Sequence, residues 1–127
     1  MDGSPLNGVI VHLADGTDAD VPEPAWCVAD HGLPVERLAD VLHDGREISF
    51  AVETPHGSAE VLPASMGQFP FATDPALRVP AVTVLVGDSW ERFSPEGVEE
   101  LADGLVVYAG RLRALGAQLA AILLSGR

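Results

Sequence analysis

Residues 94–125 decide the fold, and they read SPEGVEELADGLVVYAGRLRALGAQLAAILLS. Ser94, Pro95 and Glu96 are typical of a helix start, because Ser caps free amides, Pro suits the first turn and an acid favours the positive end. Behind them, apolar residues recur three and four positions apart at Val98, Leu101, Leu105, Tyr108, Leu112, Leu115, Leu119 and Ile122. This heptad spacing predicts one helix over 94–125 with an apolar seam along its length.

A helix of this length would run roughly 45 Å, which is longer than the sheet of a small domain can cover. It would therefore either bend at Gly104, Gly110 or Gly116 and fold back in a monomer, or extend and meet a second copy. We expect the second arrangement, a homodimer. Its predicted interaction residues are Leu105, Tyr108, Leu112, Leu115, Leu119 and Ile122.

The remaining sequence predicts a small antiparallel sheet. Residues 8–14 are rich in β-branched side chains, residues 47–53 alternate apolar and polar, and residues 78–86 alternate again. Thr54-Pro55-His56-Gly57 is typical of the turn of a hairpin that returns along residues 58–62.

The other segments are predicted to be loops or short helices. Residues 17–24 and 63–80 carry several prolines and are expected to be irregular, whereas apolar spacing in residues 34–43 favours a short helix. The predicted fold is therefore α+β, with about four mostly antiparallel strands packed on one long C-terminal helix and a short helix after the Cys–His segment.

Length and composition indicate one soluble domain. The 127 residues fit a single domain over 1–127, with residues 1–7 expected to be flexible. An acidic residue, Asp2, stands where a secretory signal needs basic ones, and the lone Cys27 forms no internal disulfide. These features predict a cytoplasmic protein.

The charge balance restricts the partners. Nineteen acidic residues face seven basic ones, all Arg, and the net charge is −12. Nucleic acids and anionic membranes attract the opposite sign, and the uncharged apolar run at 115–125 is too short to span a bilayer. We therefore expect no nucleic-acid and no membrane partner, and leave open a basic protein.

Three residues near the centre could carry chemistry. Cys27, His31 and His43 offer the sulfur and nitrogen atoms that zinc prefers. A structural zinc needs four ligands, and Asp30, Asp40, Asp44 and His56 are the candidates for the fourth. The alternative is a buried thiol beside two unligated histidines, and a thiolate–imidazolium pair for nucleophilic catalysis is disfavoured because nearby acids raise a thiol pKa.

The same residues carry a family resemblance. Pro24-Ala25-Trp26-Cys27 followed by His31, together with a Leu/Ala-rich terminal helix, resembles a small actinobacterial family classed as a domain of unknown function. That family shows a Pro-x-Trp-Cys-x-x-x-His signature, and the likeness covers about residues 9–121. The resemblance implies an actinobacterial cytoplasmic origin and implies no activity.

The sequence thus favours a non-enzymatic protein-interaction or accessory module, homodimeric through its C-terminal helix. We assign no catalytic and no cofactor-binding residues, and predict a metal site at Cys27, His31 and His43 that would take zinc. The partners expected are a second copy of the chain and an unidentified protein. The alternative is a small metal-dependent or cysteine-based enzyme that uses the same three residues.

Overall fold

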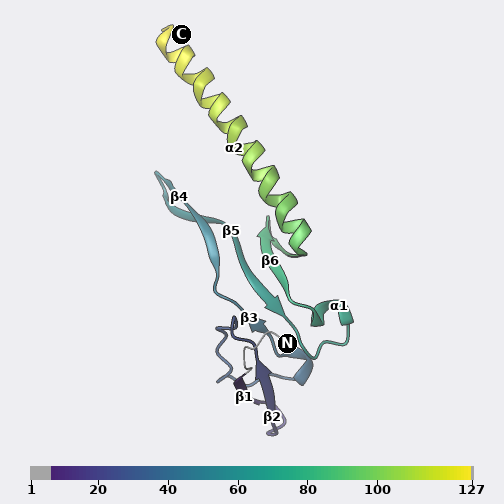
Figure 1. Ribbon diagram of the computed structural model, residues 1–127. Coiled ribbons are helices and arrows are strands. Elements are labelled where there is room, and N and C mark those ends of the chain that lie inside the picture. Colours follow the sequence, from purple (N-terminus) through teal and green to yellow (C-terminus); the bar gives the residue numbers. More distant parts are fainter. Residues whose placement is uncertain (1–6, 127) are drawn as a thin grey trace. The chain divides into compact units, whose positions relative to one another are not determined.

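The computed structural model describes residues 7–126, which form two compact units that meet in sequence at Phe93 and Ser94 (Figure 1). The flexible start expected at residues 1–7 lies outside the described range except for Asn7. Antiparallel sheets, one long C-terminal helix and a short helix together confirm the α+β fold class.

The first unit opens with a two-stranded antiparallel sheet, β1 (Asn7–His12) and β2 (Asp18–Glu23). The sequence predicted β1, but residues 17–24 were expected to be a loop because of their prolines. That expectation was wrong. Among the described strands β2 pairs only with β1, so it is an edge strand, where a proline is tolerated because one side of the strand forms no hydrogen bonds with a neighbour. Val21 faces inward and is buried.

A five-stranded antiparallel sheet makes up the rest of this unit. Its strands are β3 (His43–Asp44), β4 (Ile48–Thr54), β5 (Gly57–Gln68), β6 (Ala81–Val86) and β7 (Ser89–Phe93). The order is β3-β5-β6-β7, and β4 also pairs with β5. The hairpin predicted around Thr54–Gly57 is confirmed, and the outer half of β5 pairs with β4 alone, so this hairpin projects from the sheet (Figure 1).

Two segments between the strands differ from the prediction. In place of a helix over 34–43, the chain forms one 3₁₀ turn, Leu38–Asp40, and then enters β3. The apolar spacing in this stretch serves other partners, because Val35 bridges Leu13 and Val41 is buried against Val11 and Val21. The segment 63–80, expected to be irregular, contains the end of β5 and a short helix, α1 (Pro75–Arg78).

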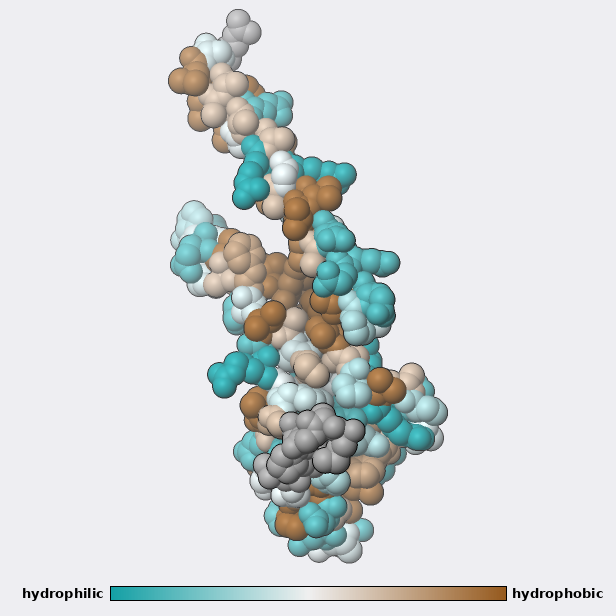
Figure 2. All heavy atoms as spheres, in the orientation of Figure 1, coloured by the Kyte–Doolittle hydropathy of each residue, from teal (hydrophilic) through white to brown (hydrophobic). Residues whose placement is uncertain are grey.

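The second unit is the helix α2 (Pro95–Leu124), which confirms the C-terminal prediction. Ser94 Oγ accepts a hydrogen bond from the Gly97 amide at 3.1 Å, as expected of an N-cap. The helix is continuous over 30 residues, so the alternative in which it folds back at a glycine is wrong. Within α2 no residue is buried, and apolar side chains lie on its surface (Figure 2).

The length and composition of α2 also meet the criteria for a segment that could cross a membrane. The other helices described are a single turn each.

The core of the described residues is small. Its buried apolar side chains are Val11, Val21, Val41, Ala64, Ala72 and Val84. Val11, Val21 and Val41 form one cluster that joins β1 and β2 to the chain leading into β3. Packing between the two-stranded sheet and the rest of its unit therefore relies on this small cluster and on the partly buried apolar side chains around it, Val9, Leu13, Ala19 and Val35.

Candidate metal centre

Four metal-binding side chains from three segments converge in the first unit. Glu23 ends β2, Cys27 and His31 lie in the loop after it, and His43 begins β3. One donor atom from each lies within 4.8 Å of the others. The three residues predicted from the sequence are therefore brought together, and Glu23 completes a group of four that can hold a metal ion.

Local hydrogen bonds position these residues. The Cys27 amide donates to the Pro24 carbonyl at 3.0 Å, closing a turn directly after β2. The next amide, of Val28, donates to the Asp44 carbonyl at 2.8 Å, which ties the loop to β3. Pairing of His43 with Gln68 of β5 then anchors β3 to the larger sheet. The group therefore lies where the chain passes from the smaller sheet to the larger.

The interatomic distances are those of a compact polar cluster. His31 Nε2 lies 2.9 Å from Glu23 Oε1 and 3.7 Å from Cys27 Sγ. The rings of His31 and His43 meet edge to face, with centroids 5.7 Å apart. His43 also meets the Trp26 ring edge to face, with centroids 6.3 Å apart. Trp26 therefore forms an apolar wall beside the cluster.

His43 is the most deeply placed of the four. Its side chain is 2 % exposed, and its Nδ1 atom is buried without a hydrogen-bond partner among the described residues. Burial lowers the pKa of His43, and the neighbouring His31 adds to this effect, against the opposing pull of Glu23 and a hydrogen bond with the Pro22 backbone. A neutral imidazole with a free nitrogen is the form that binds metals.

The Cys27 thiol is shifted in the opposite sense. Burial raises the pKa of Cys27, and a hydrogen bond to the Glu23 carboxylate together with its negative charge raises it further. In the absence of a cation the thiol therefore keeps its proton at neutral pH. A thiol in this state is a poor nucleophile, which agrees with the sequence argument against cysteine catalysis.

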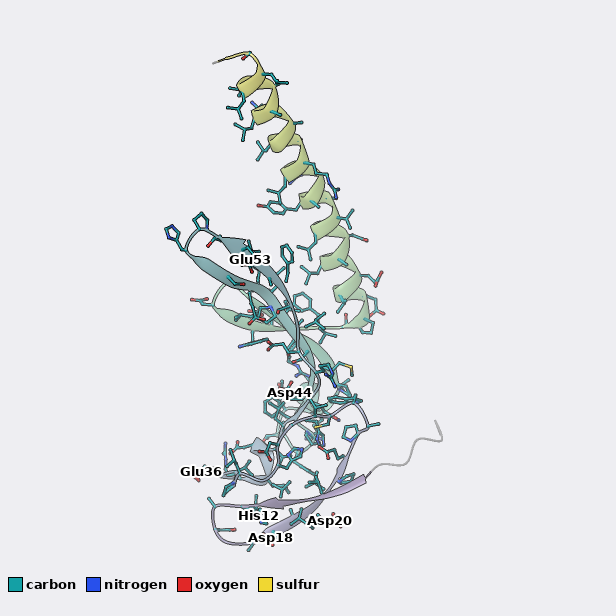
Figure 3. The ribbon with its side chains drawn as sticks, turned by 90° about the vertical axis from the view of Figure 1, so that its left-hand side faces the viewer. His12, Asp18, Asp20, Glu36, Asp44 and Glu53 are labelled. Atoms are coloured by element: carbon teal, nitrogen blue, oxygen red, sulfur yellow. The ribbon has the colours of Figure 1, made fainter. Side chains whose placement is uncertain are left out.

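The four residues proposed as the fourth ligand are not in the group, and Glu23 takes that place. Each of the three aspartates has another partner: Asp30 accepts from the Gly32 amide, Asp40 pairs with Arg37, and Asp44 accepts from Ser65 Oγ. His56 lies in the exposed turn of the β4–β5 hairpin. Figure 3 shows Asp44 in place on β3, apart from His12 and Asp18 on the β1–β2 hairpin.

The spacing of residues in the sequence could have indicated Glu23 as a ligand. It precedes Cys27 by four residues, the same spacing that separates Cys27 from His31. Because residues 17–24 were expected to be a loop, the sequence did not indicate that Glu23 ends a strand beside Cys27. The six predicted interaction residues all lie on α2 and are 42–62 % exposed.

Comparison with known proteins identifies the family and no activity. No curated protein and no solved structure matches the chain significantly. A family model described as a domain of unknown function, DUF6907, matches residues 9–121. That range contains the four clustered side chains and most of α2. Because the match covers most of the sequence, the chain belongs to the DUF6907 family.

Proposed function

We propose that this chain is a non-enzymatic protein-interaction module whose first unit is stabilised by a zinc ion held by Glu23, Cys27, His31 and His43. The observation that supports this most strongly is the group of four convergent donors, in which His43 carries a buried, unpartnered Nδ1. Buried polar atoms are nearly always paired, and a metal ion would give this nitrogen its partner.

The spacing of the donors suits zinc. Tetrahedral zinc with ligands at 2.0–2.3 Å places them about 3.3–3.8 Å from one another. The distance of 3.7 Å from Cys27 Sγ to His31 Nε2 already falls in that range, and the 2.9 Å contact of His31 with Glu23 would open slightly. The four donors already lie within 4.8 Å of one another, so small side-chain adjustments would reach the zinc geometry.

The charge of the group also suits a divalent ion. One thiolate and one carboxylate balance the two positive charges of zinc, and two neutral imidazoles complete the set. A neutral complex has the smallest cost of burial. This matters here because the His31 and Glu23 side chains are only 9 % and 23 % exposed.

A closed set of four protein ligands favours a structural role, since a catalytic zinc keeps one position open for water. The interaction role is supported by features outside the cluster. α2 carries an exposed apolar seam, which we propose mediates homodimerisation, and the net charge of −12 favours a basic protein as a further partner. The free thiol and the family resemblance support an actinobacterial, cytoplasmic setting.

The alternative function is a small metal-dependent enzyme. The 2.9 Å pairing of Glu23 with His31 favours it, because a Glu that stays off the metal would leave three ligands and an open position. The two functions differ in what chelation does. Removal of a structural zinc should unfold the part of the first unit around the site, β1, β2 and β3, whereas removal from an open catalytic site should leave the fold intact.

Metal analysis of the purified chain tests the proposal. We expect about one zinc per chain, and a loss of most of it in Cys27→Ser and His43→Gln. His12→Gln is the matched control, because His12 is exposed and paired with Asp18 on β1–β2. Circular dichroism at 222 nm should show α2 retained in all three variants. Less than about 0.2 zinc per chain in the unmodified protein would overturn the zinc site.

A further inference from the structure

The apolar seam of α2 is exposed from Leu105 onward, which fits a helical partner. Its residues form an uninterrupted apolar stripe on a helix in which nothing is buried. In the heptad repeat Val98, Leu105, Leu112 and Leu119 occupy one core position, and Leu101, Tyr108, Leu115 and Ile122 the other. Contiguous exposed apolar surface of this kind marks an interaction site in a protein that remains in water.

The residues beside the seam allow a close approach. One flank carries Ala102, Ala109 and Gly116 at successive heptads, and a side chain added at Gly116 would meet nothing within 4 Å. Most charges of the helix lie away from the seam, and Arg111 is the one described charge on a flanking position. This is the arrangement of a helix that packs its seam against another helix and keeps its back in water.

We propose that α2 pairs in antiparallel orientation with α2 of a second copy, centred on Gly110. The inference rests on the proposed homodimerisation and adds its geometry. In this register each residue at the first core position of one helix lies opposite a residue at the second core position of the partner helix. The layers are Val98 with Ile122, Leu101 with Leu119, Leu105 with Leu115, and Tyr108 with Leu112, each formed twice.

The distribution of charge supports the antiparallel orientation. Residues 1–93 hold fifteen Asp and Glu against four Arg. A parallel pair would bring two such units to the same end of the helices. An antiparallel pair separates their attachment points by the helix length of about 45 Å, several times the Debye length of about 8 Å at physiological salt.

The charges of α2 itself act in the same direction. Its acidic residues all fall in 96–103, and its Arg residues fall at 111 and beyond. Antiparallel pairing puts the acidic start of each helix beside the uncharged or basic half of the other, and it opposes the two helix dipoles favourably. The opposing contribution is Arg111 beside its own copy at the centre, an exposed like-charge contact that costs a few tenths of a kcal/mol.

A bilayer is the competing environment for α2, because its length and composition would allow it to span one. Arg111 and Arg113 lie inside the apolar half of the helix, and near a bilayer centre each would cost roughly 2.5–3.5 kcal/mol. A helix pair accommodates Arg111 and Arg113 at lower cost, because both side chains extend from the edge of the helix–helix contact into water.

Sedimentation equilibrium of the full zinc-loaded chain tests the seam. We expect a dimer whose dissociation constant rises at least ~100-fold in Leu112→Glu, because a carboxylate would be buried against Tyr108 of the second copy. Val106→Glu is the matched control, since Val106 is apolar and 72 % exposed but lies off the seam. Its dissociation constant should stay within about threefold. A monomeric unmodified chain, or one that inserts into phosphatidylcholine–phosphatidylglycerol vesicles, would overturn the pairing.

Disulfide trapping then tests the orientation. In the antiparallel register two copies of residue 98 are about 36 Å apart, so Val98→Cys alone should not cross-link, whereas Val98→Cys with Ile122→Cys should give a 98–122 disulfide. Peptide mass spectrometry separates these bonds from any that involve Cys27. A 98–98 disulfide in the single variant would overturn the antiparallel orientation while leaving the dimer and the zinc site standing.

Discussion

His43 and Cys27 show how single side chains prepare a site for a cation. Burial and His31 hold the His43 imidazole neutral by lowering its pKa, and burial with Glu23 holds the Cys27 thiol protonated by raising its pKa. Both shifts have the sign expected of groups whose charged form is disfavoured by burial. A divalent ion would reverse the situation for Cys27, because it stabilises the thiolate directly.

Zinc binding should therefore release a proton from Cys27. Because the pKa of Cys27 is raised, the thiol is protonated at pH 7, and a ligand must be deprotonated to bind. Affinity should rise about tenfold per pH unit near neutrality and level off once the pH exceeds the thiol pKa. Calorimetry in two buffers of different ionisation enthalpy should give about one proton released per zinc. A pH-independent affinity would exclude Cys27 as a ligand.

Among the elements, α2 and the β4–β5 hairpin use glycine in opposite ways. Gly110 lies inside α2, where an added methyl group would meet open space, whereas Gly57 closes the hairpin at φ +121°. The first glycine only weakens a helix, while the second adopts a conformation that other residues rarely reach. The same hairpin contains a bulge between Ile48 and Phe50, near which Leu62 of β5 has φ 53°.

Substitution by alanine should separate these two roles. Gly110→Ala should stabilise α2 by about 0.5–1 kcal/mol, and Gly57→Ala should destabilise the sheet by about 1–3 kcal/mol. Thermal melting followed at 222 nm reports on the helix, and urea unfolding followed by the fluorescence of Trp26 and Trp90 reports on the first unit. Equal and same-signed effects at both positions would contradict the assignment.

For the whole molecule, the decisive feature is how little the described chain buries. Six apolar side chains and His43 are the buried set, and a small cluster around Val11, Val21 and Val41, with the Leu13–Val35 bridge, links the smaller sheet to the segment that leads into β3. Small cores commonly need a metal or oligomerisation to be stable. The proposed zinc site would stabilise the first unit, and the proposed dimer would stabilise the second.

Removing zinc should loosen the smaller sheet before the larger one. The proposed ligands come from β2, the loop after it and β3, so chelation should speed amide hydrogen exchange in residues 7–12, 18–23 and 43–44 by at least ~10-fold. Residues 81–93 of β6 and β7 hold no ligand and serve as the internal control. Unchanged exchange in β1 and β2 would show that apolar packing and backbone pairing hold them without a metal ion.

Patterns within one segment were enough to predict α2, its Ser94 cap, the β4–β5 hairpin and three members of the donor group, because each depends on periodicity or spacing between neighbours. Only tertiary structure decided that Glu23 is the fourth member and that His43 begins a strand. Two strand pairings place these side chains. β2 pairs with β1, and β3 pairs with β5, where His43 lies opposite Gln68, a residue 25 positions later in the sequence. Such long-range pairing overrides the local loop and helix preferences of residues 17–24 and 34–43, since burial of Val21 and Val41 outweighs them.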